Sequence, residues 1–266
     1  MKTDAYQRAE MPAGRNSVLD QRSLEASNAN LLTVLQPGQR VLDVGCGSGA
    51  ITAGIAAQVG EDGVVMGIDR SADLIGQAQQ KFAAIGNLRF EAVDILDYAP
   101  EHRYDVITTA RTLQWIADPV VVVRKMIGLL KPGGVLCVLD YNHELIDWEP
   151  EPPKEMRFFY DCFLRWRADA GMYNDIIDRL PAMLGSEGLR ITLNRDESEY
   201  RQKGEAGFRQ HLDIWTRVAE MRGKPIVSDG YLTEEQRLAA IDAYTRWCET
   251  EARGMRLHLR AVHAQR

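Results

Sequence analysis

The chain has 266 residues, of which 45% are hydrophobic and 26% charged, with a formal net charge of −6 at pH 7. This composition predicts an ordered globular protein with a sizeable core, long for one average domain and short for two. The acidic balance argues against DNA or RNA as the main partner. No apolar run approaches the roughly 18 residues that a membrane-spanning helix needs.

The first 60 residues predict a helix, a turn, a strand and a second helix. A helix is expected over residues 17–35, and Pro37-Gly38 breaks the chain after it. Residues 41–44 form a short apolar run that leads into glycines, which is typical of a buried strand. The small apolar residues 50–59 suit a helix packed on a sheet.

The next 50 residues continue the alternation of strands and helices. Residues 64–69 predict a second strand, and Ser71 is a good N-cap for a helix over residues 72–85. Residues 88–93 and 104–109 predict the third and fourth strands. This order indicates βαβ units and a mostly parallel sheet.

Residues 120–130 contain four valines and fit either a helix or a strand by composition. Their length and the stop signal Lys131-Pro132-Gly133-Gly134 favour the helix, and residues 135–140 follow as a fifth strand. In a doubly wound parallel sheet, ligands bind at the carboxyl ends of the strands. We therefore expect the functional residues after these strands.

Beyond residue 140 the sequence becomes rich in aromatic residues, arginines and prolines. Residues 189–193 predict a strand, and residues 205–222 and 234–253 predict helices. Thr233 and Gln236 form a capping box for the second of these helices. Residues 255–263 alternate in polarity and predict a last strand at an edge of the sheet.

The domain division that we predict has three parts. Residues 1–140 form an N-terminal helix and the cofactor-binding half of a Rossmann-like core. Residues 141–188 form a helical lid insertion. Residues 189–266 supply the last strands of the core and a further helical lid insertion.

The segment Gly45-Cys46-Gly47-Ser48-Gly49-Ala50 has the glycine spacing of a loop that binds a nucleotide cofactor at a helix N-terminus. This spacing also fits the dinucleotide pattern G-x-G-x-x-G/A, or a merely structural turn. Asp43 favours another cofactor, because its carboxylate would repel a pyrophosphate and attract an ammonium group.

Two further aspartates end the next two predicted strands. Asp69 is placed to accept hydrogen bonds from two ribose hydroxyls, which suits NAD as well, and Asp94 to accept one from an adenine amino group. Turn formation or helix capping is the alternative role for both carboxylates.

Together these segments resemble the ordered motifs of the class I S-adenosylmethionine-dependent methyltransferases, small-molecule type. The resemblance spans about residues 30–140 and rests on five segments: 41–49, 67–69, 93–95, 104–107 and 129–134. It implies an α/β fold, namely a doubly wound Rossmann-like seven-stranded sheet whose last strand is antiparallel, with a mainly helical lid. It also implies S-adenosylmethionine as the cofactor.

The resemblance assigns cofactor-binding roles by position. The loop around Cys46 would lie close to the methionine part, and Asp69 would hold the ribose. Arg70, Asp94 and Ile95 would surround the adenine, and Ala110 and Arg111 would lie near the sulfonium. The predicted cofactor-binding residues are Asp43, Gly45, Cys46, Gly47, Asp69, Arg70, Asp94, Ile95, Ala110 and Arg111. The similar quinone-type C-methyltransferases often have a histidine near the position of Gln114, and its absence argues against a quinone acceptor.

Asp140-Tyr141-Asn142-His143-Glu144 follows the fifth strand and should lie at the same rim of the sheet. Some acceptors need a general base, for which His143 is the candidate, with Tyr141 as a polar wall. A surface loop histidine is the alternative for His143. Aromatic residues of the lid would line an acceptor pocket or, as composition favours, form the lid's own core.

Four arginines suggest a carboxylate acceptor through bidentate pairing, although salt bridges to nearby acidic residues are the simpler role: Arg157, Arg165, Arg167 and Arg179. The four cysteines are far apart and form no CxxC pair, so we expect no metal site and no disulfide framework. Residues 1–10 lack an apolar h-region, and a cytoplasmic location is expected.

The sequence therefore predicts a methyltransferase that acts on oxygen, nitrogen or carbon of a small molecule, without nucleic acid or membrane as partner. Two other functions stay open. One is an NAD-dependent oxidoreductase on a similar sheet, and the other is a non-catalytic S-adenosylmethionine-binding protein. No motif identifies the acceptor or the oligomeric state.

Overall fold

The computed structural model describes residues 4–9 and 22–266. Its strands are β1 (Arg40–Val44), β2 (Val64–Asp69), β3 (Leu88–Ala92), β4 (Tyr104–Ala110), β5 (Leu130–Glu149), β6 (Arg190–Asp196), β7 (Glu199–Gln202) and β8 (Gly254–Gln265). Its longer helices are α4 (Ala50–Val59), α5 (Ala72–Lys81), α6 (Pro119–Leu129), α7 (Lys154–Ala168), α8 (Ile176–Ser186), α9 (Phe208–Met221) and α11 (Glu234–Thr250). Shorter helices are α1 (Ala5–Ala9), α3 (Leu24–Ser27), η1 (Ala29–Thr33), η2 (Leu113–Trp115) and α10 (Gly223–Ser228).

Within these described residues, the strands form one eight-stranded sheet with the order β3-β2-β1-β4-β5-β8-β6, and β7 pairs with β8 beside that path. Strands β1 to β5 pair in parallel with one another, whereas β8 runs antiparallel to β5, β6 and β7. This is the predicted doubly wound sheet with an antiparallel last strand.

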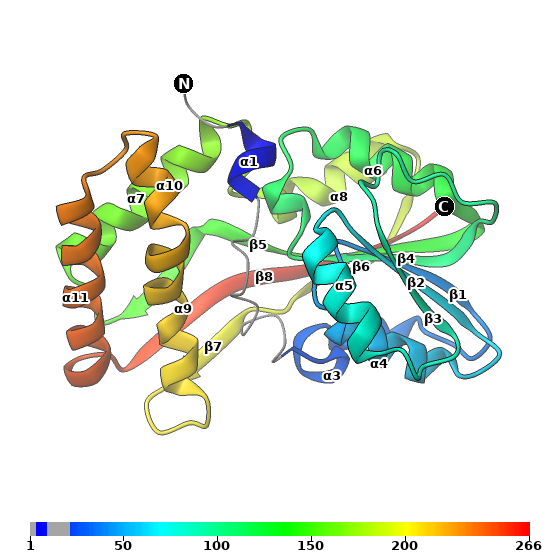
Figure 1. Cartoon of the computed structure of the whole chain (residues 1–266), viewed down its shortest axis with the longest axis horizontal. Coiled ribbons are helices and arrows are strands. Elements are labelled where there is room, and N and C mark those ends of the chain that lie inside the picture. Colours follow the sequence, from blue (N-terminus) through cyan, green and yellow to red (C-terminus); the bar gives the residue numbers. More distant parts are fainter. Residues whose placement is uncertain (1–3, 10–21) are drawn as a thin grey trace.

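Helices cover both faces of the sheet (Figure 1). One face packs on α6 and α8 through residues such as Val123, Met126 and Leu180. The other face packs on α3 and α4 through Leu24 and Ile55. Helix α8 packs on β5, β6 and β8. The segment 141–188, predicted as a lid insertion, therefore also contains a helix that covers the sheet.

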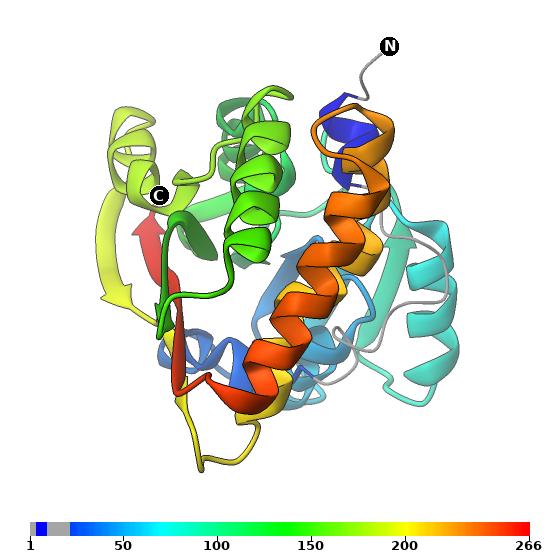
Figure 2. The same ribbon diagram turned by 90° about the vertical axis from the view of Figure 1, so that its left-hand side faces the viewer.

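Helices α7, α9, α10 and α11 stand beyond the carboxyl end of β5 and the amino end of β8, and we use the name lid for this group of helices (Figures 1 and 2). These two strands are long, and they pair from Val135 with Gln265 to Glu149 with Gly254. The pairing shifts register between Tyr141 and Ile146. Beyond the shift, the strands leave the sheet core and join the lid.

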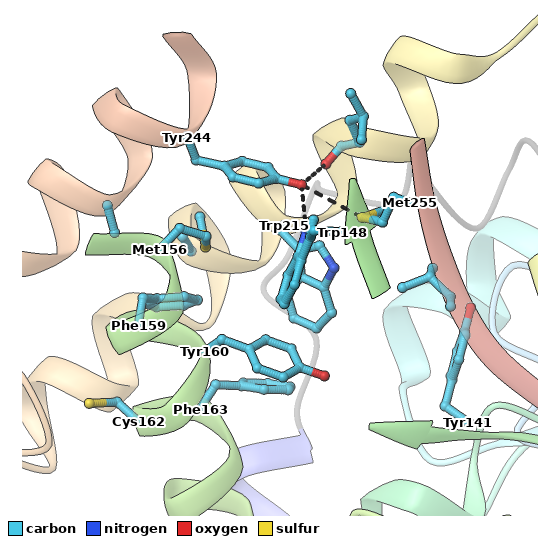
Figure 3. Close-up of a cluster of buried hydrophobic side chains, with 14 of the residues drawn as sticks. Tyr141, Trp148, Met156, Phe159, Tyr160, Cys162, Phe163, Trp215, Tyr244 and Met255 are labelled. Atoms are coloured by element: carbon cyan, nitrogen blue, oxygen red, sulfur yellow. Dashed lines mark hydrogen bonds between the residues drawn. The ribbon is translucent and has the colours of Figure 1, made fainter. Parts of the chain in front are cut away.

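The lid has its own aromatic core (Figure 3). Phe159, Phe163 and Trp215 are each at most 2% exposed there. The Tyr244 hydroxyl donates to the Leu212 carbonyl at 3.3 Å and accepts from Trp148 Nε1 at 3.2 Å. The lid aromatics therefore mainly pack against one another, as their composition favoured.

Two predicted elements were wrong. The helix expected over residues 17–35 is broken at Asn28, and α3 and η1 replace the part of it that lies within the described residues. The Asn28 backbone is neither helical nor extended (φ −153°, ψ 38°), and its side chain accepts from Asn30 instead of leaving the helix uninterrupted. The last strand lies inside the sheet between β5 and β6 rather than at an edge.

Most other local signals were confirmed. Helix α4 covers the predicted residues 50–59, and Ser71 caps α5 by accepting from the Leu74 amide. The capping box of Thr233 and Gln236 is present at the start of α11. In the described part of the chain, no helix is long and apolar enough to cross a membrane.

Candidate functional site

A pocket lies at the carboxyl ends of β1 and β4, where the chain turns from β1 into α4. Its lining includes five residues of the predicted cofactor set and four others: Asp43, Gly45, Cys46, Gly47 and Ala110, with Arg22, Ser48, Ala50 and Ile51. The remaining predicted residues Asp69, Arg70, Asp94, Ile95 and Arg111 are not part of this lining.

The glycine loop needs its glycines for two reasons. Gly45 and Gly49 have φ angles of 75° and 74°, a left-handed region that side chains rarely adopt. A Cβ on Gly45 would also lie 2.4 Å from Thr112 Oγ1, and one on Gly49 would lie 2.5 Å from the Phe90 ring. The loop can therefore keep this conformation and this packing only with glycine at these positions.

Asp43 is the buried acid of the pocket. One of its carboxylate oxygens accepts a 2.7 Å hydrogen bond from Thr52 Oγ1 of α4. Burial raises the pKa of Asp43 to about 6, against the smaller opposing effect of the Thr52 hydrogen bond. The carboxylate is ionised at neutral pH, although in this environment its charge is costly unless a cation neutralises it.

Asp69 ends β2 and supports the glycine loop. Its two oxygens accept from the backbone amides of Gly47 and Ser71, both at 2.9 Å. A carboxylate oxygen has two lone pairs, so each keeps one for a hydroxyl group of a ligand. Both the predicted ligand contact and the alternative structural role are therefore possible for the same side chain.

Arg70, Asp94 and Ile95 lie around the ends of β2 and β3. The Arg70 guanidinium stacks 4.0 Å from the ring centroid of Tyr6 in α1 and donates to the Tyr6 carbonyl. One Asp94 oxygen accepts from the Leu96 amide and closes a turn, while Ile95 is buried in the core. The N-terminal helix α1 thus lies against the edge where the adenine is expected.

Arg111 follows β4 with a left-handed backbone, φ 58°, unusual for a residue other than glycine. Its buried guanidinium donates to the Tyr141 hydroxyl, the Ser27 carbonyl and Glu199, at 3.0, 2.9 and 2.7 Å. Burial lowers the pKa of Arg111, but Tyr141 and Glu199 together raise it above its ordinary value. Arg111 therefore ties β4 to α3, β5 and β7.

His143 lies on β5, not in a surface loop, and its ring packs against those of Tyr141, Phe163 and Trp215. Gln114 Oε1 accepts from Arg167, so the same oxygen must also accept from His143 Nε2. This leaves Nδ1 as the basic atom of the imidazole. Burial, and next Arg167, lower the pKa of His143 well below 6.5, so the ring is neutral at pH 7.

The four arginines proposed for a carboxylate acceptor have protein partners. Arg157 pairs with Glu151 and Arg179 with Asp175. Arg167 donates to Asn174 and to the Gln114 carbonyl, and Arg165 contacts the sulfur of Cys162. None of the four is among the lining residues of the pocket.

Of the four pocket residues outside the predicted set, Arg22 is the one that does not belong to the glycine loop or to α4. It stands in a stretch without a motif, about 20 residues before the glycine loop. The local signal beside it is Ser23, which caps α3 by accepting from the Ala26 amide and so marks the start of a helix but not a pocket. Only the packing of α3 on α4 brings Arg22 to the pocket.

The sheet order, the antiparallel β8 and an acidic glycine-loop pocket define a Rossmann-like protein that binds a nucleoside cofactor at the end of β1. A family profile described as "Methyltransferase domain" matches residues 35–175. The chain belongs to this family, the class I S-adenosylmethionine-dependent methyltransferases, and its cofactor is S-adenosylmethionine. Family membership decides against the NAD-dependent oxidoreductase.

Two curated relatives differ in how much of the chain they match. The trans-aconitate 2-methyltransferase of Methylobacterium radiotolerans is 34% identical, over 85% of this chain and 84% of its own length. The ubiquinone/menaquinone biosynthesis C-methyltransferase of Vibrio campbellii is 33% identical, over 42% of this chain and 45% of its own length. The second similarity therefore spans less than half of either protein.

Solved structures share the fold at low sequence identity. A methyltransferase from Aquifex aeolicus superposes with a TM-score of 0.54 and 17% identity, over 99% of both chains. The [4+2]-cyclase SpnF has a TM-score of 0.56 and 19% identity, over 89% of this chain and 79% of its own. Because one neighbour is a cyclase by name, the fold alone does not define the reaction.

Proposed function

We propose that this protein transfers the methyl group of S-adenosylmethionine to a small molecule that bears a carboxylate, and that the carboxylate oxygen is the acceptor. The observation that carries this proposal is the neutral, weakly basic His143 on β5, which is hydrogen-bonded to Gln114 in the segment that follows β4. A carboxylic acid is already ionised at neutral pH, so its methylation needs no general base.

The similarity to the trans-aconitate enzyme supports the same class of acceptor. That relative matches 85% of the chain, whereas the quinone-type relative matches 42%. The longer match necessarily includes much of the second half, which contains the lid. Acceptors differ between methyltransferases while the cofactor is shared, so similarity over the lid is the more informative part.

The cofactor supplies the reactive methyl group when it is bound, and the protein has to position the acceptor oxygen in line with it. Ala110 ends β4 and Arg111 follows it, where the resemblance places the sulfonium, and the Tyr141 hydroxyl accepts a hydrogen bond from the Arg111 guanidinium there. We propose Tyr141 as a wall of the acceptor site. For an acceptor that must lose a proton, His143 would be the base through Nδ1.

The test uses the purified full-length protein, methyl-labelled S-adenosylmethionine and a panel of small acids, amines and phenols, with trans-aconitate among the acids. We expect label in the methyl ester of one of the acids and its release as methanol by mild alkali, because methyl esters hydrolyse under these conditions. A label that stays in the product after alkali, as in N-methyl and C-methyl compounds, would contradict the carboxylate proposal.

A variant of His143 separates the two kinds of acceptor. His143→Gln keeps a hydrogen-bonding group next to Gln114 but removes the imidazole lone pair. For a carboxylate acceptor, kcat should change less than about tenfold, since general bases contribute roughly 100- to 10,000-fold where they act. A larger loss of kcat that depends on pH would assign His143 as the base instead.

A further inference from the structure

The pocket at the end of β1 presents one anionic and one cationic side chain to the same small space. Asp43 and Arg22 line it together with the glycine loop and the first residues of α4. A buried charge needs a partner of opposite sign, or its burial is costly. A ligand group that satisfies both side chains carries an ammonium and a carboxylate side by side.

In the described part of the chain, the Arg22 guanidinium has no direct protein partner, and the charges of Glu199 and Asp140 favour its protonated form only from a distance. Among the described residues, none forms a hydrogen bond or ion pair with its guanidinium, whereas the neighbouring Arg111 is held by Tyr141, Ser27 and Glu199. Burial, and next the charge of Arg111, lower the pKa of Arg22 to about 10. The guanidinium therefore stays protonated at neutral pH and can bind an anion.

The segment that contains Arg22 is fixed from two sides. Leu24 is fully buried against α4, where a Cβ on Gly54 would lie 2.7 Å from Leu24 Cβ. At the other end of α3, the Ser27 carbonyl accepts from Arg111 at 2.9 Å. Arg22 precedes this anchored turn, so its position is set by packing and not by its own side chain.

The start of α4 adds positive potential at the same place. Ala50 and Ile51 line the pocket, and the N-cap Gly49 has no side chain to accept from the first amides of the helix. The first amides of a helix have no intrahelical acceptor, and the helix dipole places partial positive charge there. Asp43, in contrast, accepts from Thr52 on one oxygen only, so it can receive an ammonium group as well.

We infer that Arg22 binds the α-carboxylate of the methionine part of S-adenosylmethionine, beside Asp43, which receives the α-ammonium group. Arg22 is a cofactor-binding residue in this assignment, and its guanidinium fork suits the two carboxylate oxygens. The inference rests on cofactor binding and not on the acceptor proposed above, so either can fail without the other.

Two ligands that differ in the amino-acid part test this inference. S-adenosylhomocysteine contains the carboxylate and the ammonium group, and 5′-methylthioadenosine lacks both. By calorimetry on the full-length protein, Arg22→Gln should weaken binding of S-adenosylhomocysteine about 10- to 100-fold, the range for a charge-assisted hydrogen bond. Binding of 5′-methylthioadenosine should change less than about twofold.

Arg22→Lys and Arg246→Gln are the matched variants. The lysine keeps the charge but not the fork, so it should restore part of the affinity for S-adenosylhomocysteine. Arg246 pairs with Asp242 on α11, outside the pocket lining, and its replacement should leave both affinities unchanged. If Arg22→Gln fails to fold, the comparison of the two ligands is made with Arg22→Lys.

Two results would overturn the assignment. One is an unchanged affinity of the Arg22 variants for S-adenosylhomocysteine. This result includes the case in which the affinity is unchanged and only the KM for an acidic acceptor rises. That case would place the acceptor carboxylate on Arg22. The other is an equal loss of affinity for both ligands, which would mean that Arg22 acts on the shape of the pocket rather than on the carboxylate.

Discussion

Replacing Asp43 by asparagine should make the folded protein more stable and a poorer cofactor binder. Burial raises the pKa of Asp43 from 3.8 to about 6 in the folded state. This difference of about two pKa units, at about 1.4 kcal/mol each, corresponds to about 3 kcal/mol of unfolding free energy. The folded state carries this cost because it disfavours the ionised form.

The sign of the shift sets the pH window. A carboxyl group with a raised folded pKa destabilises the protein fully above about pH 6, and the cost disappears as the pH falls toward 3.8. Asparagine is neutral throughout. The free energy of unfolding of the Asp43→Asn variant should therefore exceed that of the wild type by up to about 3 kcal/mol at about pH 7.5. At about pH 4.5 the difference should be about 1 kcal/mol.

Urea unfolding at both pH values measures this difference, and other titrating groups cancel between variant and wild type. Asp97→Asn, at an exposed position, is the control and should stay within about 0.5 kcal/mol of the wild type at both. The reasoning is refuted if the advantage of Asp43→Asn is the same at both pH values. At neutral pH, the variant should also lose affinity for S-adenosylhomocysteine but not for 5′-methylthioadenosine.

Two further predictions concern the glycine loop and the ion pair of Arg111. Gly49→Ala should lower the free energy of unfolding more than Gly188→Ala does. Both glycines have positive φ angles, which cost an alanine about 1–2 kcal/mol of backbone strain, but only a Cβ on Gly49 meets the Phe90 ring. Urea unfolding of the two variants should show this excess. Equal losses would contradict the packing. A double-mutant cycle on Arg111 and Glu199, with side chains 4% and 33% exposed, should give a coupling of about 1–3 kcal/mol, against at most about 0.5 kcal/mol for Arg246 and Asp242, both 66% exposed. Similar coupling energies for the two pairs would show that the ion pair of Arg111 does not stabilise the packing of β4 against β7.

The part of the fold that could be predicted is the part whose signals are local. Asp43, the glycines after it and Ser71 each act within a few residues of their own position, so the strands and helices of residues 41–140 follow from short segments. Asp43 and Asp69 also lie at the carboxyl ends of β1 and β2, and a parallel sheet brings such ends together without any further information.

The rest depends on contacts between distant segments. Arg22 reaches the pocket because Leu24 packs on Gly54, and no sequence pattern around Arg22 predicts that contact. His143 was expected in a loop, but β5 continues past it because β8 pairs with β5 as far as Glu149. The last strand was expected at an edge because its polarity alternates, yet pairing with β6 on its other side places it inside the sheet.

The two long strands that join the sheet to the lid also define where the chain can be cut and joined to build chimaeric proteins. The lid is attached through β5, through β8 and through the chain between β6 and α9, so a chimaera that exchanges the lid needs junctions in all three places. Tyr141 and Ile146 bracket the register shift, which makes the segment between them a natural junction in β5. A junction before Tyr141 would also replace residues of the cofactor half, together with the Tyr141 hydroxyl that accepts a hydrogen bond from Arg111.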